Sequence, residues 1–484
     1  MNNADSIRLA QIAERAMVER GFLPRPPPEA LKEAAAARQP AAGDGLRDLR
    51  QLPWSSIDNP ESRDLDQIEA IEEIDGGTRL YVGIADVDFF VARGSAIDGF
   101  AGHNTTSVYT GIRTFPMLPD RLSYDLSSLV ANQLRPSVVI ETSLDGKGEI
   151  SGGTVYRAWV TNRAKLDYPS VSAWLEGQAP PPEPLAKDAA LRRQLESQDR
   201  LAQLLGQARK RQGALDVETP EMRAVTNESG ELTGLSTHHQ DRAGRLIEEL
   251  MIASNRTVAR TLDAKSFASI RRVVKEPERW ARIVTYAAEH GFELPAAPSS
   301  IALSRFVDQM REKRPADFPE ISLALVKLMG RGEYVAHRPG APEIGHFGLA
   351  TDRYTHATAP NRRLVDLVTQ RLIKALLNKA TAPYSFDELS EVATHATERE
   401  AAAEKVERRV NKSAAALLLL PRIGQTFEGI VTGASEKGTY VRAFSPAVEG
   451  RVIRGGKGLL VGQRVRVRLR SVDMDKGFID FEVI

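Results

Sequence analysis

The chain has 484 residues, of which 42% are hydrophobic and 27% are charged, and its formal net charge is +1. These values are ordinary for a globular protein with two or three domains, and the charge gives no overall attraction to nucleic acid. The absence of cysteine excludes disulfides, thiolate zinc sites and a cysteine nucleophile, and agrees with a reducing, cytoplasmic location. The chain has no long apolar run and Met1–Ala10 has no apolar core, so we expect neither secretion nor a membrane span.

The first 45 residues predict a small helical segment. Residues 4–20 predict an amphipathic helix that ends at Gly21, and residues 28–38 predict a second helix before an Ala/Gly-rich linker. The apolar residues of the first helix are Ile7, Ala10, Ile12, Ala16 and Val18. We interpret residues 1–45 as an N-terminal helical arm, with a small helix-turn-helix-like segment as the alternative, because about 35 ordered residues are few for an independent core.

The next feature is acidic. Residues 57–69 read I-D-N-P-E-S-R-D-L-D-Q-I-E and contain Asp58, Asp64 and Asp66. In an extended chain Asp64 and Asp66 point to the same side, and the Asn-Pro turn after Asp58 folds that residue back toward them. Three crowded carboxylates repel one another unless a cation lies between them, and Mg²⁺ or Mn²⁺ suits oxygen ligands. From spacing alone, a solvated acidic loop is the more common explanation.

Strands and helices follow in the middle of the chain. Residues 79–87 predict a strand in a hairpin with residues 68–74, and residues 137–163 predict strands broken at Asp145-Gly146 and Gly152-Gly153. Residues 185–212 and 242–261 predict helices. We interpret the pair Glu248-Glu249 on the second helix as structural. We interpret His238-His239 as lacking a metal, because no third ligand accompanies the pair.

Helices are predicted again within residues 301–329, and the run from Tyr354 to Arg363 precedes a helical pattern that begins at Leu364. Pro360 suits the first turn of that helix. Arg362 then lies near the helix N-terminus, where free N–H groups and the helix dipole attract phosphate. An ordinary salt bridge on the helix is the alternative. Residues 386–420 predict one long helix that ends at Pro421.

The tail predicts a separate module, residues 421–484. It contains five short alternating strands, and its eleven Lys and Arg against seven Asp and Glu give it a charge of +4. The pattern resembles an S1-type OB-fold, a five-stranded barrel that binds RNA. Candidates for RNA contact are Phe427, Tyr440, Phe444, Arg442, Arg451 and Arg468, although each aromatic residue is equally suited to the barrel core. Residues 464–470 alternate Val and Arg, so these arginines share one face.

Several motifs occur in the order found in the ribonuclease II family. Besides residues 57–69 they are Gly83–Val87, Pro116–Pro119, Leu122-Ser123, Leu126–Leu129, Asn132, Arg135-Pro136, Ala164–Leu166, Tyr168, Ile247–Glu249, Met251-Ile252 and Ala359–Arg363. The chain resembles this family over roughly residues 46–420. The resemblance implies an α+β protein: an RNB catalytic domain of mixed sheet and helices at residues 46–420, followed by the S1-type barrel. The family often has two cold-shock-type domains before the catalytic one, so RNA entry is expected to differ here.

The resemblance also implies an activity, namely processive 3′-to-5′ hydrolysis of single-stranded RNA to nucleoside 5′-monophosphates. Two Mg²⁺ ions about 3.5–4 Å apart serve such a reaction, with Mn²⁺ as an alternative. The matching positions are Asp58, Asp64, Asp66 and Gln67 for metal, Asp64, Asp66 and Arg362 for catalysis, and Tyr109, Arg362 and Arg363 for RNA. Tyr109 matches an aromatic residue that stacks on terminal bases, with a core tyrosine as the alternative. We expect a monomer.

One position departs from the family pattern. The family's fourth aspartate falls at Gln67, whose amide offers an oxygen but no charge, and affinity at oxygen sites follows ligand charge. The alternative hypothesis is therefore a catalytically weak or silent RNA-binding protein that keeps the fold. A DNA-directed function ranks third.

Overall fold

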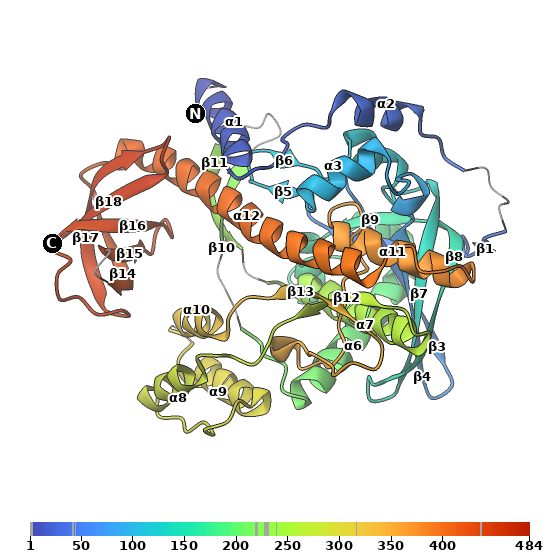
Figure 1. Cartoon of the computed structure of the whole chain (residues 1–484). Helices are drawn as coiled ribbons and strands as arrows, with labels where there is room; N and C mark the ends of the chain where they lie inside the picture. The colour runs from blue at the N-terminus through green and yellow to red at the C-terminus, as the bar shows by residue number, and fades with distance from the viewer. Residues whose placement is uncertain are drawn as a thin grey trace.

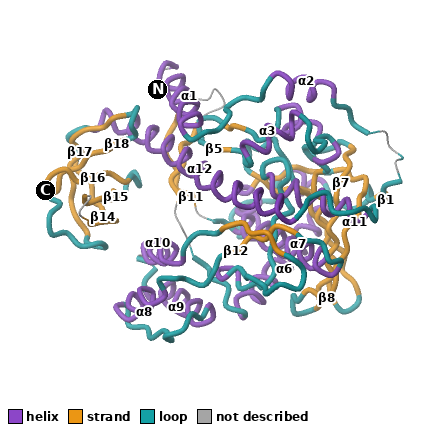
Figure 2. Tube along the Cα trace, in the orientation of Figure 1, coloured by secondary structure: helices purple, strands orange, loops and turns teal. Residues whose placement is uncertain are grey.

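In the computed structural model, one long helix joins a large body of sheets and helices to a small β-barrel (Figures 1 and 2). The structure describes residues 3–40, 43, 45–217, 221–226, 232–238, 240–315, 317–435 and 438–484. The long helix is α12 (Phe386–Leu419), and a short 3-10 turn that contains Pro421 follows it, which confirms the predicted helix and its end.

The main body is built on a seven-stranded sheet with the order β1-β8-β7-β4-β3-β2-β9. The strands are β1 (Arg47–Asp48), β2 (Ser55–Asp58), β3 (Gln67–Ile74), β4 (Gly77–Ala85), β7 (Leu134–Asp145), β8 (Ile150–Thr161) and β9 (Ala164–Asp167). Strands β3 and β4 form the predicted hairpin, in which Gln67 pairs with Ile84. Its turn contains Gly76 at φ +78°, a conformation that glycine adopts without steric cost. This hairpin extends the chain directly after the acidic stretch.

The predicted strand break at Gly152-Gly153 is wrong, because β8 runs through both glycines. A close contact explains the glycine at the second position: a Cβ on Gly153 would lie 2.4 Å from Thr257 Cγ2 of α7 (Arg242–Ala264). Here glycine lets a helix approach the sheet rather than ending the strand.

Helices α6 (Ala189–Arg211) and α7 pack against each other and against the sheet. The single helix predicted at residues 185–212 is two helices, because Asp188 caps α6 after the short α5 (Glu183–Lys187). Arg209 of α6 pairs with Glu249 of α7 through Nε–H and Oε2 at 2.8 Å, which confirms the structural interpretation of the glutamate pair. His238-His239 lies outside the residues whose side chains the structure describes.

The N-terminal helix α1 (Asn3–Glu19) lies along α12 (Figure 1). Its buried face consists of Leu9, Ile12, Ala13, Ala16 and Met17. The predicted apolar stripe is therefore wrong at two positions, since Ile7 is 53% and Val18 is 61% exposed. The residues that pack against α12 recur at helical spacing on one face of α1, and Ile7 and Val18 lie outside that face.

The tail is a closed barrel with the strand order β14-β15-β16-β18-β17, as an S1-type OB-fold requires. Its strands are β14 (Thr426–Ser435), β15 (Gly438–Ala443), β16 (Glu449–Arg454), β17 (Arg464–Asp473) and β18 (Phe478–Val483). In β17 the valines and Leu469 are buried while the arginines between them are exposed, which confirms the predicted alternation. The barrel core also contacts Ala415, Ala416 and Leu419, so the end of α12 closes one side of the barrel.

The remaining elements surround the sheet or form a separate helical lobe with its own core (Figure 1). They are α2 (Pro28–Ala36), α3 (Ala96–Asn104), β5 (Val108–Tyr109), β6 (Thr114–Phe115), α4 (Tyr168–Leu175), β10 (Glu221–Thr226), β11 (Leu232–His238), β12 (Ser269–Val273), α8 (Trp280–Glu289), α9 (Ser300–Lys313), α10 (Phe318–Met329), β13 (Glu333–His337) and α11 (Leu364–Leu377). Among the described residues, every helix is too short or too polar to cross a membrane.

Candidate active site

A tight turn after β2 fixes Asp58. Its Oδ1 accepts hydrogen bonds from the Asn59 backbone N–H and the Ser62 hydroxyl, both at 2.7 Å. Burial raises the pKa of Asp58, and Asp64 raises it further, although both hydrogen bonds oppose the shift. The turn predicted from the Asn-Pro pair is therefore present, and it holds the carboxylate at the end of a sheet strand.

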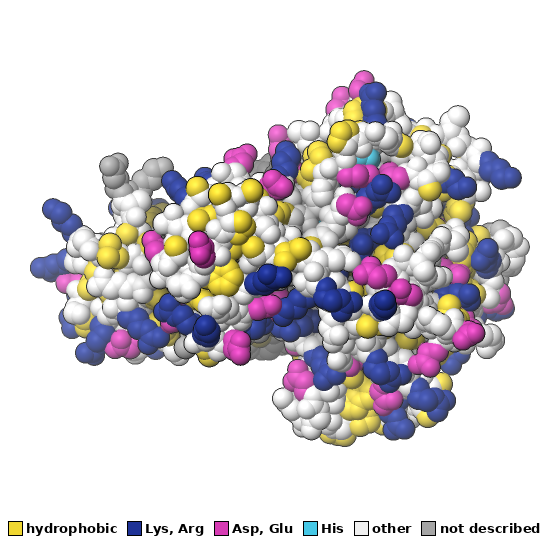
Figure 3. All heavy atoms as spheres, turned by 90° about the horizontal axis from the view of Figure 1, so that it is seen from below, with side chains coloured by type: hydrophobic (Ala, Val, Ile, Leu, Met, Phe, Trp, Pro, Cys, Tyr) yellow, Lys and Arg dark blue, Asp and Glu magenta, His cyan; other side chains and the backbone are white. Residues whose placement is uncertain are grey.

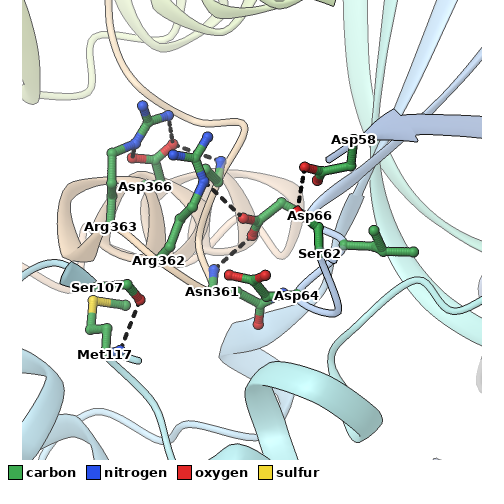
Figure 4. A network of polar contacts seen from close by, with 12 residues as sticks. Asp58, Ser62, Asp64, Asp66, Ser107, Met117, Asn361, Arg362, Arg363 and Asp366 are labelled. Atoms are coloured by element: carbon green, nitrogen blue, oxygen red, sulfur yellow. Dashed lines mark hydrogen bonds and ion pairs between the residues drawn. The ribbon is translucent and has the colours of Figure 1, made fainter. Parts of the chain in front are cut away.

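Asp66 is the most enclosed of the three aspartates, with 2% of its surface exposed. Its Oδ1 accepts the Asn361 backbone N–H at 2.8 Å, and its Oδ2 lies 3.4 Å from Arg362 Nε (Figure 4). Burial raises the pKa of Asp66 to about 8, although Arg362 opposes this shift. The structure thus brings together the predicted aspartate and the predicted arginine, which are far apart in the sequence.

Asp64 contacts the predicted aromatic residue. The Tyr109 hydroxyl donates to Asp64 Oδ2 at 2.6 Å, and the Tyr109 backbone N–H donates to Glu407 of α12 at 3.0 Å. The tyrosine is 40% exposed, so it is not a core residue. Its ring borders a cavity and is held in place from both ends.

Two neighbouring serines form hydrogen bonds with residues that adjoin Asp66. The Ser127 hydroxyl donates to Asn361 Oδ1 at 2.5 Å, and the Ser128 hydroxyl accepts the Leu65 N–H at 3.0 Å. Asn361 and both serines are buried. Sequence reasoning placed these residues in motifs but assigned them no role, because a positioning contact between distant segments has no local pattern.

Arg363, which was predicted to contact RNA, is held by an ion pair within the protein. Its guanidinium makes two 2.8 Å bonds with Asp366, and in Figure 4 it points away from Asp58, Asp64 and Asp66. The helix α11 begins at Leu364, with Arg363 as its N-cap residue. Pro360 therefore precedes the helix instead of lying in its first turn, and the loop before α11 carries Arg362 to Asp66.

Gln67 is 8% exposed and lines the same cavity as Asp58 and Asp64. Two residues farther along the same face of β3, Glu69 is fully buried, and neither of its carboxylate oxygens has a hydrogen-bond partner among the described residues. Burial and nearby Asp58 raise the pKa of Glu69 well above its usual range. Sequence reasoning gave Glu69 no role at the site, because it lies beyond the aspartate pattern that ends at Gln67.

The donor set suits a hard cation, since it consists of carboxylate and amide oxygens. Within the described part of the chain, the one group of His, Asp or Glu ligand atoms that all lie within 4.8 Å of one another is Asp263, His337 and Glu343, where Arg271 and Arg353 already pair with the carboxylates. The aspartates of the site are therefore spread too widely for one ion's shell. Two ions about 3.5–4 Å apart need a wider set of ligands. Burial raises the pKa of Asp66, and Arg362 and the Asn361 N–H offset that effect only in part.

A cavity of about 1410 Å³ lies between the main body, α12 and the barrel. Asp58, Asp64, Tyr109 and Arg362 line it on the side of the main body, and Arg442 of the barrel also lines it. Figure 3 shows Lys and Arg side chains on the barrel and across its junction with the main body, with acidic side chains among them.

Three barrel residues predicted to contact RNA have different surroundings. Phe427 is 5% exposed and stacks edge-on against Phe481 in the barrel core, so the prediction that it contacts RNA is wrong. Tyr440 is half-buried on β15 and does not border the cavity. Arg442 lines the cavity and forms an ion pair of 3.1 Å with Glu320 of α10, which ties the barrel to the helical lobe.

Comparison with known proteins agrees with this architecture. Residues 46–379 match the RNB domain, and residues 425–484 match the RNase II-type exonuclease C-terminal S1 domain. Ribonuclease R of Escherichia coli is 29% identical over 477 residues, which cover 91% of this chain and 57% of the relative. Ribonuclease R of Thermotoga maritima is 29% identical, covering 96% of this chain and 69% of the relative. The chain thus spans little more than half of some relatives.

Solved structures are similar over the whole chain. Mycoplasma genitalium RNase R in complex with ribose-methylated single-stranded RNA has a TM-score of 0.89 at 25% identity, covering 100% of this chain and 79% of that one. Yeast Ssd1, a pseudonuclease, has a TM-score of 0.68 at 18% identity, covering 86% of this chain and 51% of that one, and shares the fold alone. The sheet, the acidic stretch, the barrel and the matched segments together show that this chain belongs to the RNB-domain family and carries a C-terminal S1 domain of the RNase II type.

Proposed function

We propose that the protein is a 3′-5′ exoribonuclease that hydrolyses single-stranded RNA processively to nucleoside 5′-monophosphates with Mg²⁺ or Mn²⁺. The observation that carries this proposal is the contact between Asp66 and Arg362 beside the cavity. An arginine whose side chain is 43% exposed, beside a buried carboxylate, is placed to bind a phosphate that enters from the cavity.

The chemistry divides among a few residues. Divalent ions held by Asp58, Asp64, Asp66 and Gln67 would supply an activated water and neutralise charge on the phosphate. The Arg362 guanidinium donates N–H groups to the phosphate oxygens, and Asp66 fixes its orientation. The exposed face of Tyr109 stacks on a terminal base, while its bond to Asp64 keeps the ring beside the reacting phosphate.

Gln67 supports a second candidate, a catalytically weak or silent RNA-binding protein. The amide removes one negative charge from the metal-binding set, and the fold alone is compatible with silence, as the pseudonuclease Ssd1 illustrates. Both candidates predict binding of single-stranded RNA, so only turnover separates them.

The test is degradation of a 3′-extended RNA in Mg²⁺ or Mn²⁺ by the wild type, Asp66→Asn and Gln67→Asp. We expect the wild type to release nucleoside 5′-monophosphates and Asp66→Asn to bind RNA without releasing them. Binding without cleavage by the wild type, together with cleavage by Gln67→Asp, would instead establish the silent protein. A substrate with a 2′-deoxy 3′ end tests preference for RNA over DNA in the same assay.

A further inference from the structure

A second, smaller recess lies between α1 and α12, beside the cavity described above. We call it the α1–α12 groove; it has a volume of about 300 Å³. Its charged lining consists of Arg20, Lys405, Arg408, Arg409 and Lys412 against the single acidic residue Glu19. Five cations against one carboxylate in so small a space form a local basic surface on a chain that is nearly neutral overall.

Three of these cations form no ion pair with a described residue. Within the described part of the chain, no carboxylate lies within ion-pair distance of Arg20, Lys405 or Arg408, and all three are exposed. Neighbouring charges on α12 differ, since Glu404 pairs with Arg331 at 3.4 Å and Lys412 approaches Glu449 at 3.8 Å. The groove therefore presents positive charge that no described carboxylate neutralises by an ion pair.

Both walls of the groove are fixed. On the α1 side, the Arg399 guanidinium stacks 3.6 Å from the Phe22 ring centroid and its Nη1 donates to the Arg20 carbonyl at 2.8 Å. Ala13, Ala16 and Met17 of α1 share a buried cluster with Ala403, Val406 and Val410 of α12. A fixed frame places the cations before a ligand arrives, which lowers the entropic cost of binding.

The groove continues into the large cavity. Arg408 and Lys412 line both spaces, so a strand that leaves the cavity on this side passes beside the groove. On α12 these residues follow Lys405 by three and seven positions, and a rise of about 1.5 Å per residue spreads the three cations over roughly 10 Å of helix. That length accommodates more than one phosphate of an extended strand.

This surface lies outside the two segments that the family models match. The matched segments are residues 46–379 and 425–484, whereas α1 lies before the first and the groove residues of α12 lie between the two. The basic groove is thus a feature of the N-terminal helix and the connecting helix of this chain.

We propose that the α1–α12 groove binds the sugar-phosphate backbone of the RNA segment 5′ of the end held in the cavity. The binding is independent of sequence because the groove offers charge and no aromatic platform. This inference rests on the proposed function for its direction, since it assumes a 3′ end near Asp66. It gives the N-terminal helix a role in RNA entry.

The test compares Arg20→Gln/Lys405→Gln with the matched control Lys32→Gln/Lys265→Gln, which removes two exposed cations elsewhere. Binding is measured without divalent ions, as a function of salt, to single-stranded RNAs on the order of 4 and 16 nucleotides. We expect the groove variant to lose affinity for the long RNA only. The slope of log K against log salt should fall by about 1.4, at roughly 0.7 per phosphate contact on a single strand.

An unchanged slope on the long RNA, or an equal loss on the short one, would overturn the groove assignment. Thermal melting of both double variants shows whether folding is intact, and Arg20→Lys/Lys405→Arg, which keeps the charges, should bind the long RNA like the wild type. Binding without divalent ions is separate from turnover. A protein that fails to degrade RNA but shows the length-dependent loss would refute the nuclease proposal and keep the groove.

Discussion

The Nε of Arg362 lies 3.4 Å from one oxygen of Asp66, and the backbone N–H of Asn361, the preceding residue, donates to the other oxygen at 2.8 Å. Two consecutive residues before α11, Asn361 and Arg362, therefore contact both oxygens of the buried Asp66 carboxylate. This arrangement couples the position of the phosphate-binding arginine to that of the aspartate.

Replacing Arg362 with lysine tests whether geometry matters beyond charge. Arg362→Lys keeps the positive charge but loses the planar fork, so we expect kcat to fall roughly 10²-fold, as for loss of one transition-state donor. RNA affinity should change much less. Single-turnover assays on a 3′-labelled RNA measure the step directly, and a variant that changes only KM would mean that the arginine binds substrate without assisting hydrolysis.

The buried serine behind Asn361 predicts a second effect. Ser127→Ala removes the donor to Asn361 Oδ1 and leaves that amide under-satisfied, which should cost about 1–3 kcal/mol of unfolding free energy. Because Asn361 then positions its N–H less well, kcat should also fall while RNA affinity is kept.

Ser123→Ala is a matched control. Ser123 is equally buried, lies four residues away and donates to the Leu118 carbonyl at 3.2 Å without contacting the site. It should lower stability without a specific loss of kcat. Equal kinetic losses in both variants, with chemical denaturation as the companion measurement, would show that Ser127 acts only on folding.

Tyr109 allows the ring and the hydroxyl to be separated. Tyr109→Phe keeps the stacking face and loses the bond to Asp64, so KM should stay near that of the wild type while kcat drops a few-fold. Tyr109→Ala loses the face as well, and stacking worth about 1–3 kcal/mol per base predicts a KM rise of roughly tenfold or more. Steady-state kinetics on a short RNA distinguishes them. Tyr81→Phe, a hydroxyl loss beside Glu72, is the control.

Patterns in the sequence predicted those elements that depend on residues close together in the chain. The alternation after Gln67 predicted the β3–β4 hairpin, and the alternating valines and arginines predicted β17, because side chains of period two mark a half-buried strand wherever it lies. The separation of Asp64 and Asp66 likewise predicted a shared acidic region. The approach of Arg362, nearly 300 residues away, came only from family resemblance.

Other features depend on partners that local sequence does not identify. Ile7 and Val18 are as apolar as the buried residues of α1, but they lie outside the face that packs against α12. For Phe427 the sequence was compatible with RNA contact and with the barrel core. In the structure it packs edge-on against Phe481 in the core. Glu69 occupies a position where burial of a carboxylate is costly, so no propensity argument anticipates it.

A histidine away from the aspartates predicts how stability depends on pH. The Nδ1 of His346 accepts the Leu349 N–H at 3.1 Å, which requires a neutral ring. Burial, followed by the charge of Arg272, lowers the pKa of His346 from 6.5 to about 4. The unfolded chain therefore binds a proton between these values that the folded chain does not. Stability must fall as pH drops from about 6.5 and level off below about 4 for this group.

The shift corresponds to roughly 3 kcal/mol at full effect, and partial exposure of His346 reduces the expected contribution to about 1–2 kcal/mol. His346→Asn keeps an acceptor for the Leu349 N–H but does not titrate, so its unfolding free energy should fall less steeply between pH 6.5 and pH 4. Urea denaturation of both proteins across this range measures the difference, with acidic groups contributing equally to each. Parallel curves would mean that His346 protonates freely in the folded state, despite its burial and the nearby charge of Arg272.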